Sequence, residues 1–269
     1  MTTLSSLALH VTFSLERIGK AGVLCLIAAT LSYSQPFPQA HAHNDYAHPH
    51  PLFDALNYGF ISVEADVHLV RGKLLVSHSR PVHEIRTLEE LYLSPLDSIV
   101  RANSGKIYPA YDGTFFLMID IKTEAESTYR VLREVLLRYP ALLRTSEFHH
   151  PITIFLSGNR PMGTVVNDPA SLVALDGRPS DLGKFYTVAV MPVISDNYKN
   201  WSDGNGKGTG DLKKISALAN RVHAEGKKLR LWAIPDNPEA WRALLAAGVD
   251  LISTDHLSEL NEFMRTRKK

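Results

Sequence analysis

Residues 61–78 read ISVEADVHLVRGKLLVSH, and this stretch decides the fold and the chemistry that the sequence predicts. Its first part, Ile61–Val67, is typical of a buried strand but carries two acidic residues, Glu64 and Asp66. Side chains two apart on a strand point to the same side. Two carboxylates facing inward are costly unless a cation or hydrogen bonds compensate, and Mg²⁺ or Ca²⁺ suits such a pair. A solvent-facing acidic pair at a strand end is the alternative.

The second part of this stretch predicts a hairpin. Gly72 marks the turn, and Leu74–Ser77 returns as a second short strand. Such a hairpin brings His78 back beside Asp66, to within about one residue of register. One imidazole and two carboxylates then share one site, unless His78 is an ordinary surface or core histidine.

The rest of the chain alternates short apolar runs with amphipathic segments, which predicts a parallel sheet flanked by helices. The chain has 269 residues, and a single barrel takes roughly 250 residues. A Gly-x-Gly-x-x-Gly or P-loop motif is missing, which disfavours a nucleotide-binding sheet. We therefore predict an α/β fold with one (β/α)8 TIM-type barrel over residues 36–269, regular or distorted. Its further strands are expected at Phe115–Ile121, Ile152–Leu156, Leu172–Leu175, Val188–Val193, Leu229–Ile234 and Asp250–Ser253, with a first short strand before His41.

Helix boundaries follow from local signals. Thr123 begins a Thr-x-x-Glu spacing that predicts a capping box. Asp211 is the expected N-cap of a later helix. Asn237, followed by proline, predicts the start of another helix, and Gly248 predicts its end.

The strand Phe115–Ile121 repeats the acidic pattern. Asp120 and Lys122 share one face near its carboxyl end, which is where sites are built in a barrel. Asp120 would complete a site of three carboxylates, and Lys122 would stabilise negative charge on a phosphoryl group. A structural Asp–Lys ion pair is the alternative.

Histidines and a tryptophan supply the remaining candidates. His41 and His43 lie at the end of the first short strand, where they suit metal binding or acid–base chemistry. Trp232 lies on the strand Leu229–Ile234, where it could wall a pocket or simply pack in the core.

Residues 1–35 predict a secretory signal peptide, and hence an exported protein, periplasmic or secreted. Arg17 and Lys20 precede the apolar stretch Ala21–Leu31, and small and polar residues follow. That run is short for a membrane span. An uncleaved anchor and a buried first helix are the alternatives.

Composition excludes several classes of function. The only cysteine, Cys25, lies in the predicted signal, so the folded domain lacks disulfides, a thiolate nucleophile and a cysteine zinc site. The formal net charge is +1 without a basic block, which argues against nucleic acid as a partner. A substrate with one phosphate needs only a local positive site.

Together these motifs resemble the glycerophosphodiester phosphodiesterase superfamily, which shares its barrel with phosphatidylinositol-specific phospholipase C and sphingomyelinase D. Residues 41–56, HAHNDYAHPHPLFDAL, resemble the branch named for altered inheritance of mitochondria protein 6. The resemblance runs from about residue 40 to residue 257. It is carried by His43, Glu64-x-Asp66, His78, Asp120-x-Lys122, Trp232, Gly248-Val249-Asp250 and Thr254-Asp255.

The resemblance implies a metal-dependent phosphoric diester hydrolase for a small-molecule or lipid phosphodiester, a glycerophosphodiester or (lyso)phospholipid, with peripheral membrane contact allowed and the oligomeric state open. His43 and His78 would be general acid and base, with one Mg²⁺ or Ca²⁺ on Glu64, Asp66 and Asp120. Lys122 would contact the phosphate and Trp232 would line the pocket. Asn44 stands where the family has the arginine of His-Arg-Gly, which makes it a substrate-binding candidate, and Ser79 replaces an acid after the second histidine.

Two other functions fit parts of the pattern. A metal hydrolase of the amidohydrolase or histidinol-phosphatase kind would use His41 and His43 as ligands. A non-catalytic barrel that binds a lipid headgroup would explain the missing arginine.

Overall fold

The computed structural model describes residues 35–83, 85–143, 152–201 and 212–267. Apart from its last residue, the predicted signal peptide lies outside these ranges, and so does Asp211, the predicted N-cap. In the described ranges, no helix combines the length and the apolar character needed to cross a membrane.

The strands of the described residues form one nine-stranded sheet. Its order is β1-β9-β8-β7-β6-β5-β4-β2-β3, and β1 also pairs with β2. The strands are β1 (Phe37–Ala42), β2 (Phe60–Val70), β3 (Lys73–Val76), β4 (Phe115–Ile121), β5 (Ile152–Gly158), β6 (Ala174–Gly177), β7 (Val193–Asn197), β8 (Lys228–Trp232) and β9 (Leu251–Thr254).

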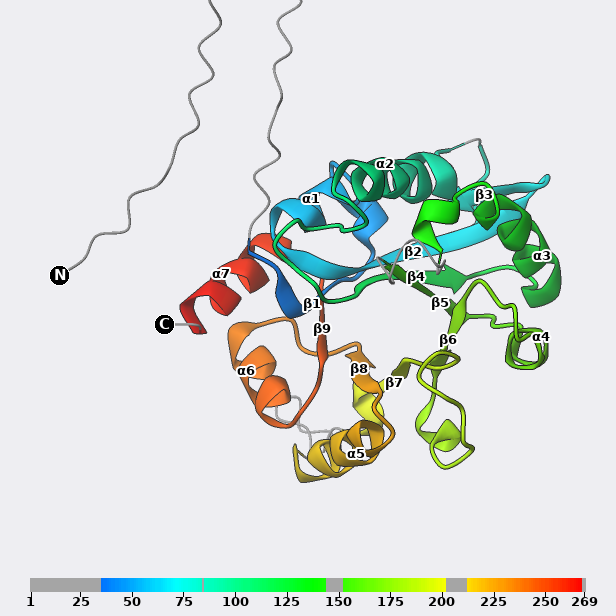
Figure 1. Ribbon diagram of the computed structural model, residues 1–269. Coiled ribbons are helices and arrows are strands. Elements are labelled where there is room, and N and C mark those ends of the chain that lie inside the picture. Colours follow the sequence, from blue (N-terminus) through cyan, green and yellow to red (C-terminus); the bar gives the residue numbers. More distant parts are fainter. Residues whose placement is uncertain (1–34, 84, 144–151, 202–211, 268–269) are drawn as a thin grey trace, which may run out of the picture. The chain divides into compact units, whose positions relative to one another are not determined.

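The pairing of β1 with both β9 and β2 closes the sheet into a barrel of eight parallel strands. In Figure 1 the blue β1 and the red β9 lie side by side, which is the point of closure. The strand β3 is antiparallel to the far end of β2 and stands outside the ring. The predicted single TIM-type barrel is therefore confirmed.

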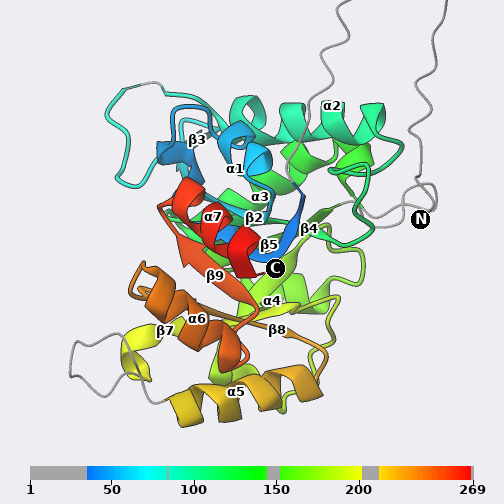
Figure 2. The same ribbon diagram turned by 90° about the vertical axis from the view of Figure 1, so that its left-hand side faces the viewer.

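Helices cover the outside of the barrel, and α5, α6 and α7 line one flank in Figure 2. The connection from β6 to β7 departs from strict alternation, because its only helical segment is the 3₁₀ turn Pro179–Asp181. The helices are α1 (Phe53–Asn57), α2 (Ser94–Ala102, preceded by the π-helical turn Glu89–Leu93), α3 (Ala125–Leu136), α4 (Met162–Asn167), α5 (Leu212–Ala224), α6 (Pro238–Ala246) and α7 (Leu257–Arg267).

Local signals placed some boundaries correctly and others wrongly. The side chain of Asn237 accepts a hydrogen bond from Ala240 N and caps α6 as predicted. The predicted cap Thr123 is wrong, because the side chain of Glu124 caps α3 by accepting from the backbone N–H groups of Glu126 and Ser127. The predicted strand Val188–Val193 is also wrong, since β7 begins only at Val193, directly after a proline that cannot donate a ladder hydrogen bond. Its earlier residues form the connecting loop, where Val188 is exposed.

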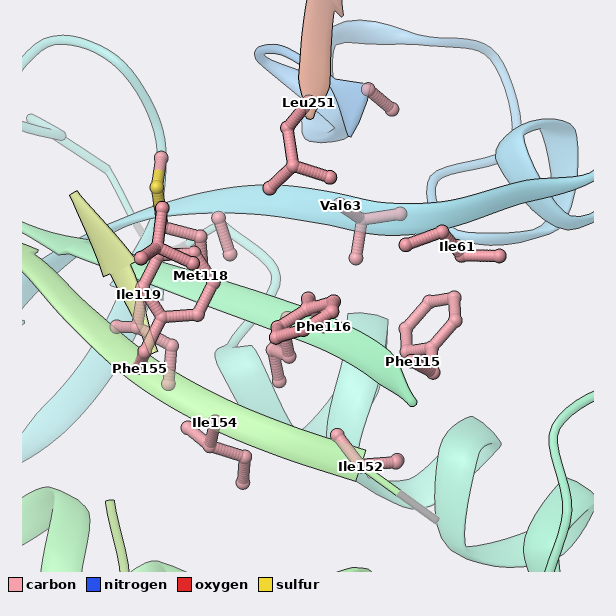
Figure 3. Packing of buried hydrophobic residues seen from close by; sticks show 14 of the residues in the cluster. Ile61, Val63, Phe115, Phe116, Met118, Ile119, Ile152, Ile154, Phe155 and Leu251 are labelled. Atoms are coloured by element: carbon pink, nitrogen blue, oxygen red, sulfur yellow. The ribbon is translucent and has the colours of Figure 1, made fainter. Parts of the chain in front are cut away.

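The interior of the barrel changes from apolar to polar towards the carboxyl ends of the strands. Phe116 and Phe155 pack edge to face at 6.0 Å between ring centroids, in the cluster shown in Figure 3. Because side chains alternate along a strand, Phe116 and Asp120 share the same face of β4. The apolar layer fills the barrel nearer the amino ends of the strands. The acidic residues lie nearer the carboxyl ends, where barrel sites are built.

Candidate functional site

The β2–β3 hairpin delivers His78 to Asp66. Arg71 and Gly72 both have positive φ, 49° and 77°, as a tight two-residue turn requires. Ser77 N donates to the backbone oxygen of Asp66, and the next residue, His78, places Nδ1 3.2 Å from Asp66 Oδ2. The predicted return of His78 to within one residue of register is therefore what the structure has.

Three carboxylates from two neighbouring strands converge. The register pairs Asp66 on β2 with Asp120 on β4, and Glu64 lies two residues before Asp66 on the same face. One oxygen of each of Glu64, Asp66 and Asp120 lies within 4.8 Å of the others. Glu64 and Asp66 are buried and Asp120 is partly buried, so their mutual repulsion is weakly screened.

Two of these carboxylates use one oxygen and leave the other free. Asp66 Oδ2 is within reach of Tyr46 OH at 2.9 Å, His78 Nδ1 at 3.2 Å and Lys122 Nζ at 3.0 Å. Asp66 Oδ1 and Asp120 Oδ1 are buried without a hydrogen-bond partner among the described residues. Buried oxygens of this kind are costly unless something compensates them, and a hard divalent cation fits this set of oxygen donors.

Lys122 bridges the two aspartates. Its Nζ lies 2.8 Å from Asp120 Oδ2 as well as 3.0 Å from Asp66 Oδ2. Burial disfavours the charged ammonium, but the hydrogen bond and charge of Asp120, followed by those of Asp66, outweigh burial and raise the pKa of Lys122. Burial raises the pKa of Asp120 in spite of Lys122. The Asp–Lys ion pair, which the sequence left open as the alternative, is thus present, and it places a positive charge at the acidic cluster.

Glu64 is held from the opposite side of the barrel. Arg230 on β8 donates from Nη2 to Glu64 Oε2 at 3.2 Å. His41 Nε2 lies 3.4 Å from the same oxygen, and its Nδ1 lies 2.7 Å from Ser62 Oγ. Burial, followed by the charge of Arg230, holds the pKa of His41 well below its usual value, so His41 is neutral at pH 7. His41 is therefore a partner of Glu64, with both ring nitrogens engaged.

His43 follows β1 and pairs with Asp255, which follows β9. His43 Nδ1 lies 2.9 Å from Asp255 Oδ1, a carboxylate that can only accept, so Nδ1 carries the hydrogen and Nε2 is left for chemistry. Burial opposes the charged imidazole, but the hydrogen bond to Asp255 and the charge of Glu64 outweigh it and raise the pKa of His43. The hydrogen bond from His43 in turn lowers the pKa of Asp255.

Asn44 and Tyr46 connect the two histidines. Asn44 Nδ2 donates at 3.4 Å to Asp255 Oδ1, the oxygen that also accepts from His43, and Asn44 Oδ1 accepts from Tyr46 OH at 2.7 Å. Tyr46 OH also lies 2.9 Å from Asp66 Oδ2, which meets His78. A continuous chain of polar contacts thus runs from His43 to His78, so both lie at one end of the barrel. The amide of Asn44 is engaged in this chain, and its predicted contact with a phosphate stays a prediction.

Trp232 ends β8 at the same mouth. It is half-buried, and the guanidinium carbon of Arg178 lies 5.1 Å from its ring centroid. Arg230, two residues earlier on the same face, reaches Glu64. The predicted position of Trp232 beside the site is thus what the structure has.

A large hollow lies away from these residues. It measures about 730 Å³ and is lined by early residues of β4 and β5, including Phe116, Ile152 and Ile154, and by Val188 and Val190 of the β6–β7 connection. Since the first residues of these strands lie at the amino end of the barrel, this hollow is remote from the carboxylates and histidines.

Sequence reasoning missed four residues of the site: Tyr46, Asp255 as the partner of His43, Arg230 and Arg178. Arg230 had a detectable signal, because a charged residue inside the apolar run Leu229–Ile234 needs a buried partner. Asp255 and Tyr46 stand in motifs of the resemblance, but their partners were not predicted, because these lie far away in the sequence or on another element.

Known phosphodiesterases are similar to this protein in fold and in part of the sequence. The barrel is similar to a glycerophosphodiester phosphodiesterase from Parabacteroides distasonis, with a TM-score of 0.55, 16% identity, and coverage of 88% of this chain and 100% of that chain. It is also similar to a calcium-dependent phosphoinositol-specific phospholipase C from Pseudomonas sp., with a TM-score of 0.56, 11% identity and coverage of 85% and 93%. Residues 228–258 match the glycerophosphoryl diester phosphodiesterase family. The fold is thus that of these solved phosphodiesterase barrels.

The chain belongs to the AIM6-like phosphodiesterase domain family, whose sequence profile matches residues 33–172. It is 28% identical to altered inheritance of mitochondria protein 6 of Lachancea thermotolerans, over 83% of this chain and 65% of that protein. It is 27% identical to a homolog of that protein from Arthroderma benhamiae, over 83% and 82%. The chain thus spans about two thirds of the length of the Lachancea relative.

Proposed function

We propose that this protein is a cation-dependent phosphoric diester hydrolase that acts on a glycerophosphodiester or a (lyso)phospholipid. Glu64, Asp66 and Asp120 would hold one Mg²⁺ or Ca²⁺. The observation that carries the proposal is the pair of buried oxygens of Asp66 and Asp120 that lack a partner among the described residues. They lie beside a polar chain that joins His43 to His78.

Two histidines would divide the proton transfers. His43, oriented through Nδ1 by Asp255, would use Nε2 as general base on the attacking oxygen. His78, tethered through Nδ1 to Asp66, would protonate the leaving oxygen. The attacking oxygen is a hydroxyl of the substrate next to phosphorus, or water. An internal hydroxyl gains from proximity and gives a cyclic phosphate first.

Charge stabilisation would come from the acidic cluster and its lysine. A bound divalent cation supplies Lewis-acid neutralisation of a phosphate oxygen. Lys122 lies against two of the three carboxylates, so its ammonium adds a fixed positive charge where negative charge develops on phosphorus.

The structure weighs against the use of His41 and His43 as a metal pair. His41 is buried among Ser62 and Glu64 with both nitrogens engaged, whereas His43 turns to Asp255. The remaining competitor is a barrel that binds an anionic headgroup without cleaving it. The engagement of the Asn44 amide inside the polar chain is the observation in its favour.

A substrate panel tests the proposal. Glycerophosphodiesters, lysophospholipids, sphingomyelin and bis(p-nitrophenyl) phosphate are each assayed with Mg²⁺, with Ca²⁺ and with chelator. We expect turnover of at least one diester with a cation, and none with chelator. Binding that stabilises the protein without any turnover would instead support the non-catalytic barrel.

Variants of the two histidines test the mechanism. His43→Gln and His78→Gln should each lower kcat by about two to four orders of magnitude, because each removes a positioned proton carrier. His223→Gln is the matched control, since His223 pairs with Asp250 on the outer side of the barrel. Unfolding midpoints show whether the variants are folded, and wild-type rates in both site variants would remove these histidines from the mechanism.

A further inference from the structure

Two arginines meet at the barrel mouth, at the ends of β5 and β6. In the ring of eight strands, β5 and β6 follow β4, whereas β7 and β8 lie across from β2 and β4 (Figure 1). Arg160 follows β5 and Arg178 follows β6, and the Nη1 atoms of both donate to the backbone oxygen of Asp176. The two guanidinium groups are therefore close neighbours.

The carboxylate of Asp176, beside these arginines, already accepts hydrogen bonds from the protein. Asp176 is fully buried, and its Oδ1 accepts from Ser195 Oγ at 2.5 Å. Its Oδ2 accepts from Ser157 Oγ and from Arg178 Nη1, both at 2.8 Å. This carboxylate thus accepts from one arginine and two serines, and Arg160 reaches only the backbone oxygen of Asp176. Burial is the main cause that lowers the pKa of Arg160, and the neighbouring charge of Arg178 lowers it further.

Most N–H donors of the Arg178 guanidinium lack a partner among the described residues. Within the described part of the chain, its side-chain hydrogen bonds to the protein all run through Nη1, to oxygens of Asp176 and Gly177. Its guanidinium lies over the ring of Trp232, 5.1 Å from the centroid, and its side chain is 26% exposed. The ring fixes the plane of the fork, and Nε and Nη2 remain as donors suited to a carboxylate or a phosphate.

The fork lies beside the proposed reaction centre. Trp232 follows Arg230 by two residues on the same face of β8, so it stands one pleat, roughly 7 Å, nearer the mouth. Arg230 touches Glu64 directly. A group bound at Arg178 is thus about one small headgroup away from a phosphate at the acidic cluster.

From this juxtaposition we infer that Arg178 binds a second anionic group of the substrate, a carboxylate or a phosphomonoester on its alcohol part. The ring of Trp232 holds Arg178 in place, and the nearby Arg160 adds positive charge. The inference rests on the proposed function, because it takes the scissile phosphate to lie at Glu64, Asp66 and Asp120. It makes Arg178 a specificity-determining residue and narrows the substrate to diesters whose headgroup carries an extra negative charge.

Matched substrates that differ by one anion test the inference. Glycerophosphoserine and glycerophosphoethanolamine differ by a carboxylate, and glycerophosphoinositol 4-phosphate and glycerophosphoinositol differ by a phosphomonoester. For at least one pair, kcat/KM should favour the anionic member by about tenfold to a hundredfold, because a charge-assisted bidentate contact is strong. The pair that shows the preference tells whether carboxylate or phosphate is recognised.

Arg178→Gln should lower kcat/KM more for the member with the extra anion than for the member without it, mainly through KM. The ratio of the two kcat/KM values should therefore fall to near one. Arg178→Lys keeps the charge but not the fork, so it should retain part of the preference and keep Asp176 paired. Arg242→Gln is the matched control. Arg242 also lies over an aromatic ring, 5.6 Å from the centroid of Phe263, but it is exposed on α6.

A binding arm separates this inference from the proposed function. O-phosphoserine and O-phosphoethanolamine are monoesters that differ by a carboxylate, so calorimetric titration with each needs no turnover. Tighter binding of O-phosphoserine that is lost in Arg178→Gln supports the anion subsite, even if every diester proves inert. Equal preference ratios for wild type and Arg178→Gln, in turnover and in binding, would overturn it, even if the protein is an active diesterase.

Discussion

Single oxygen atoms set the chemistry at the residue scale. In both Asp66 and Asp120, Oδ2 contacts protein donors, whereas the buried Oδ1 has no partner among the described residues. Lys122 neutralises part of the acidic charge and so lets these carboxylates stay close together. We interpret this division, with one oxygen fixed by the protein and the other free, as a site prepared for a cation.

The pair of His43 and Asp255 gives a pH prediction. Because Asp255 raises the pKa of His43, the limb of the pH profile that His43 governs should lie above 6.5. Asp255→Asn removes the charge and should move that midpoint to lower pH, with a lower rate because the imidazole is less firmly oriented. The profile of kcat/KM for bis(p-nitrophenyl) phosphate measures both effects.

Asp250→Asn is the control for this prediction, because Asp250 pairs with His223 at 2.7 Å on the outer side of the barrel. It should leave the midpoint in place. An unchanged midpoint in Asp255→Asn would show that His43 does not govern the limb.

The acidic residues of the site were readable from sequence for a physical reason. Glu64, Asp66 and Asp120 interrupt strands that are otherwise apolar, and only a compensated carboxylate persists there. Arg178 and Asp255 sit just after short strands, in polar surroundings where a charge is ordinary. Their contacts with Trp232 and His43 join residues far apart in the sequence, which single-sequence patterns do not reveal.

At the scale of elements, the end of β5 shapes the acidic site through a glycine. Gly158 has φ of +65°, and a Cβ there would collide with Asp120 Oδ1 and the backbone oxygen of Ile121. Gly158→Ala should therefore displace Asp120, weaken cation binding at least tenfold, and cost about 1–3 kcal/mol of stability. Calorimetric titration with Mg²⁺ or Ca²⁺ and chemical denaturation measure the two effects.

Gly163→Ala provides the comparison. Gly163 lies in α4, and an added Cβ there meets nothing within 4 Å. This variant should bind cations as wild type does. If Gly158→Ala also did so, Asp120 would not be placed by the end of β5.

Elements were predicted best where turn chemistry and burial agree. The Arg71-Gly72 turn and the strand Phe115–Ile121 are where the sequence places them. The run Val188–Val193 misled because its apolar residues cover the hollow under the barrel instead of joining the sheet. Apolar composition reports burial, and it does not distinguish a strand from a packed loop.

At the scale of the whole molecule, the barrel divides its mouth between two chemistries. Strands β2 and β4 carry the carboxylates, while the ends of β6 and β8 carry Arg178 and Trp232. The histidines arrive from β1 and from the β2–β3 hairpin. The alternation of strands and helices predicted this architecture, but the charge of each sector depends on residues that only the closed ring brings together.

Folding stability should depend on pH through Asp45. This carboxylate is buried, with Oδ2 accepting from Leu52 N and Tyr92 OH and with Oδ1 unpartnered among the described residues. Burial raises the pKa of Asp45 from 3.8 to about 7. The native state therefore binds more protons than the unfolded state, so this group lowers stability as pH rises from about 4 to about 7, by about 4 kcal/mol at most.

Asp45→Asn should remove this fall, so the stability difference between variant and wild type should grow with pH over that window. Urea denaturation at several pH values measures it. Asp112→Asn, at an exposed loop position, is the control and should show no such trend. A difference that stays flat with pH would mean that Asp45 ionises normally in the native protein.

The central claim is that three carboxylates hold one cation on which phosphodiester cleavage depends. Its most direct test is a titration of chelator-stripped protein with Mg²⁺ or Ca²⁺, following heat and the hydrolysis rate together. We predict one cation per chain, a rate that rises in step with occupancy, and loss of both in Asp120→Asn. Full hydrolysis by the stripped protein, or undiminished cation binding by Asp120→Asn, would contradict the account.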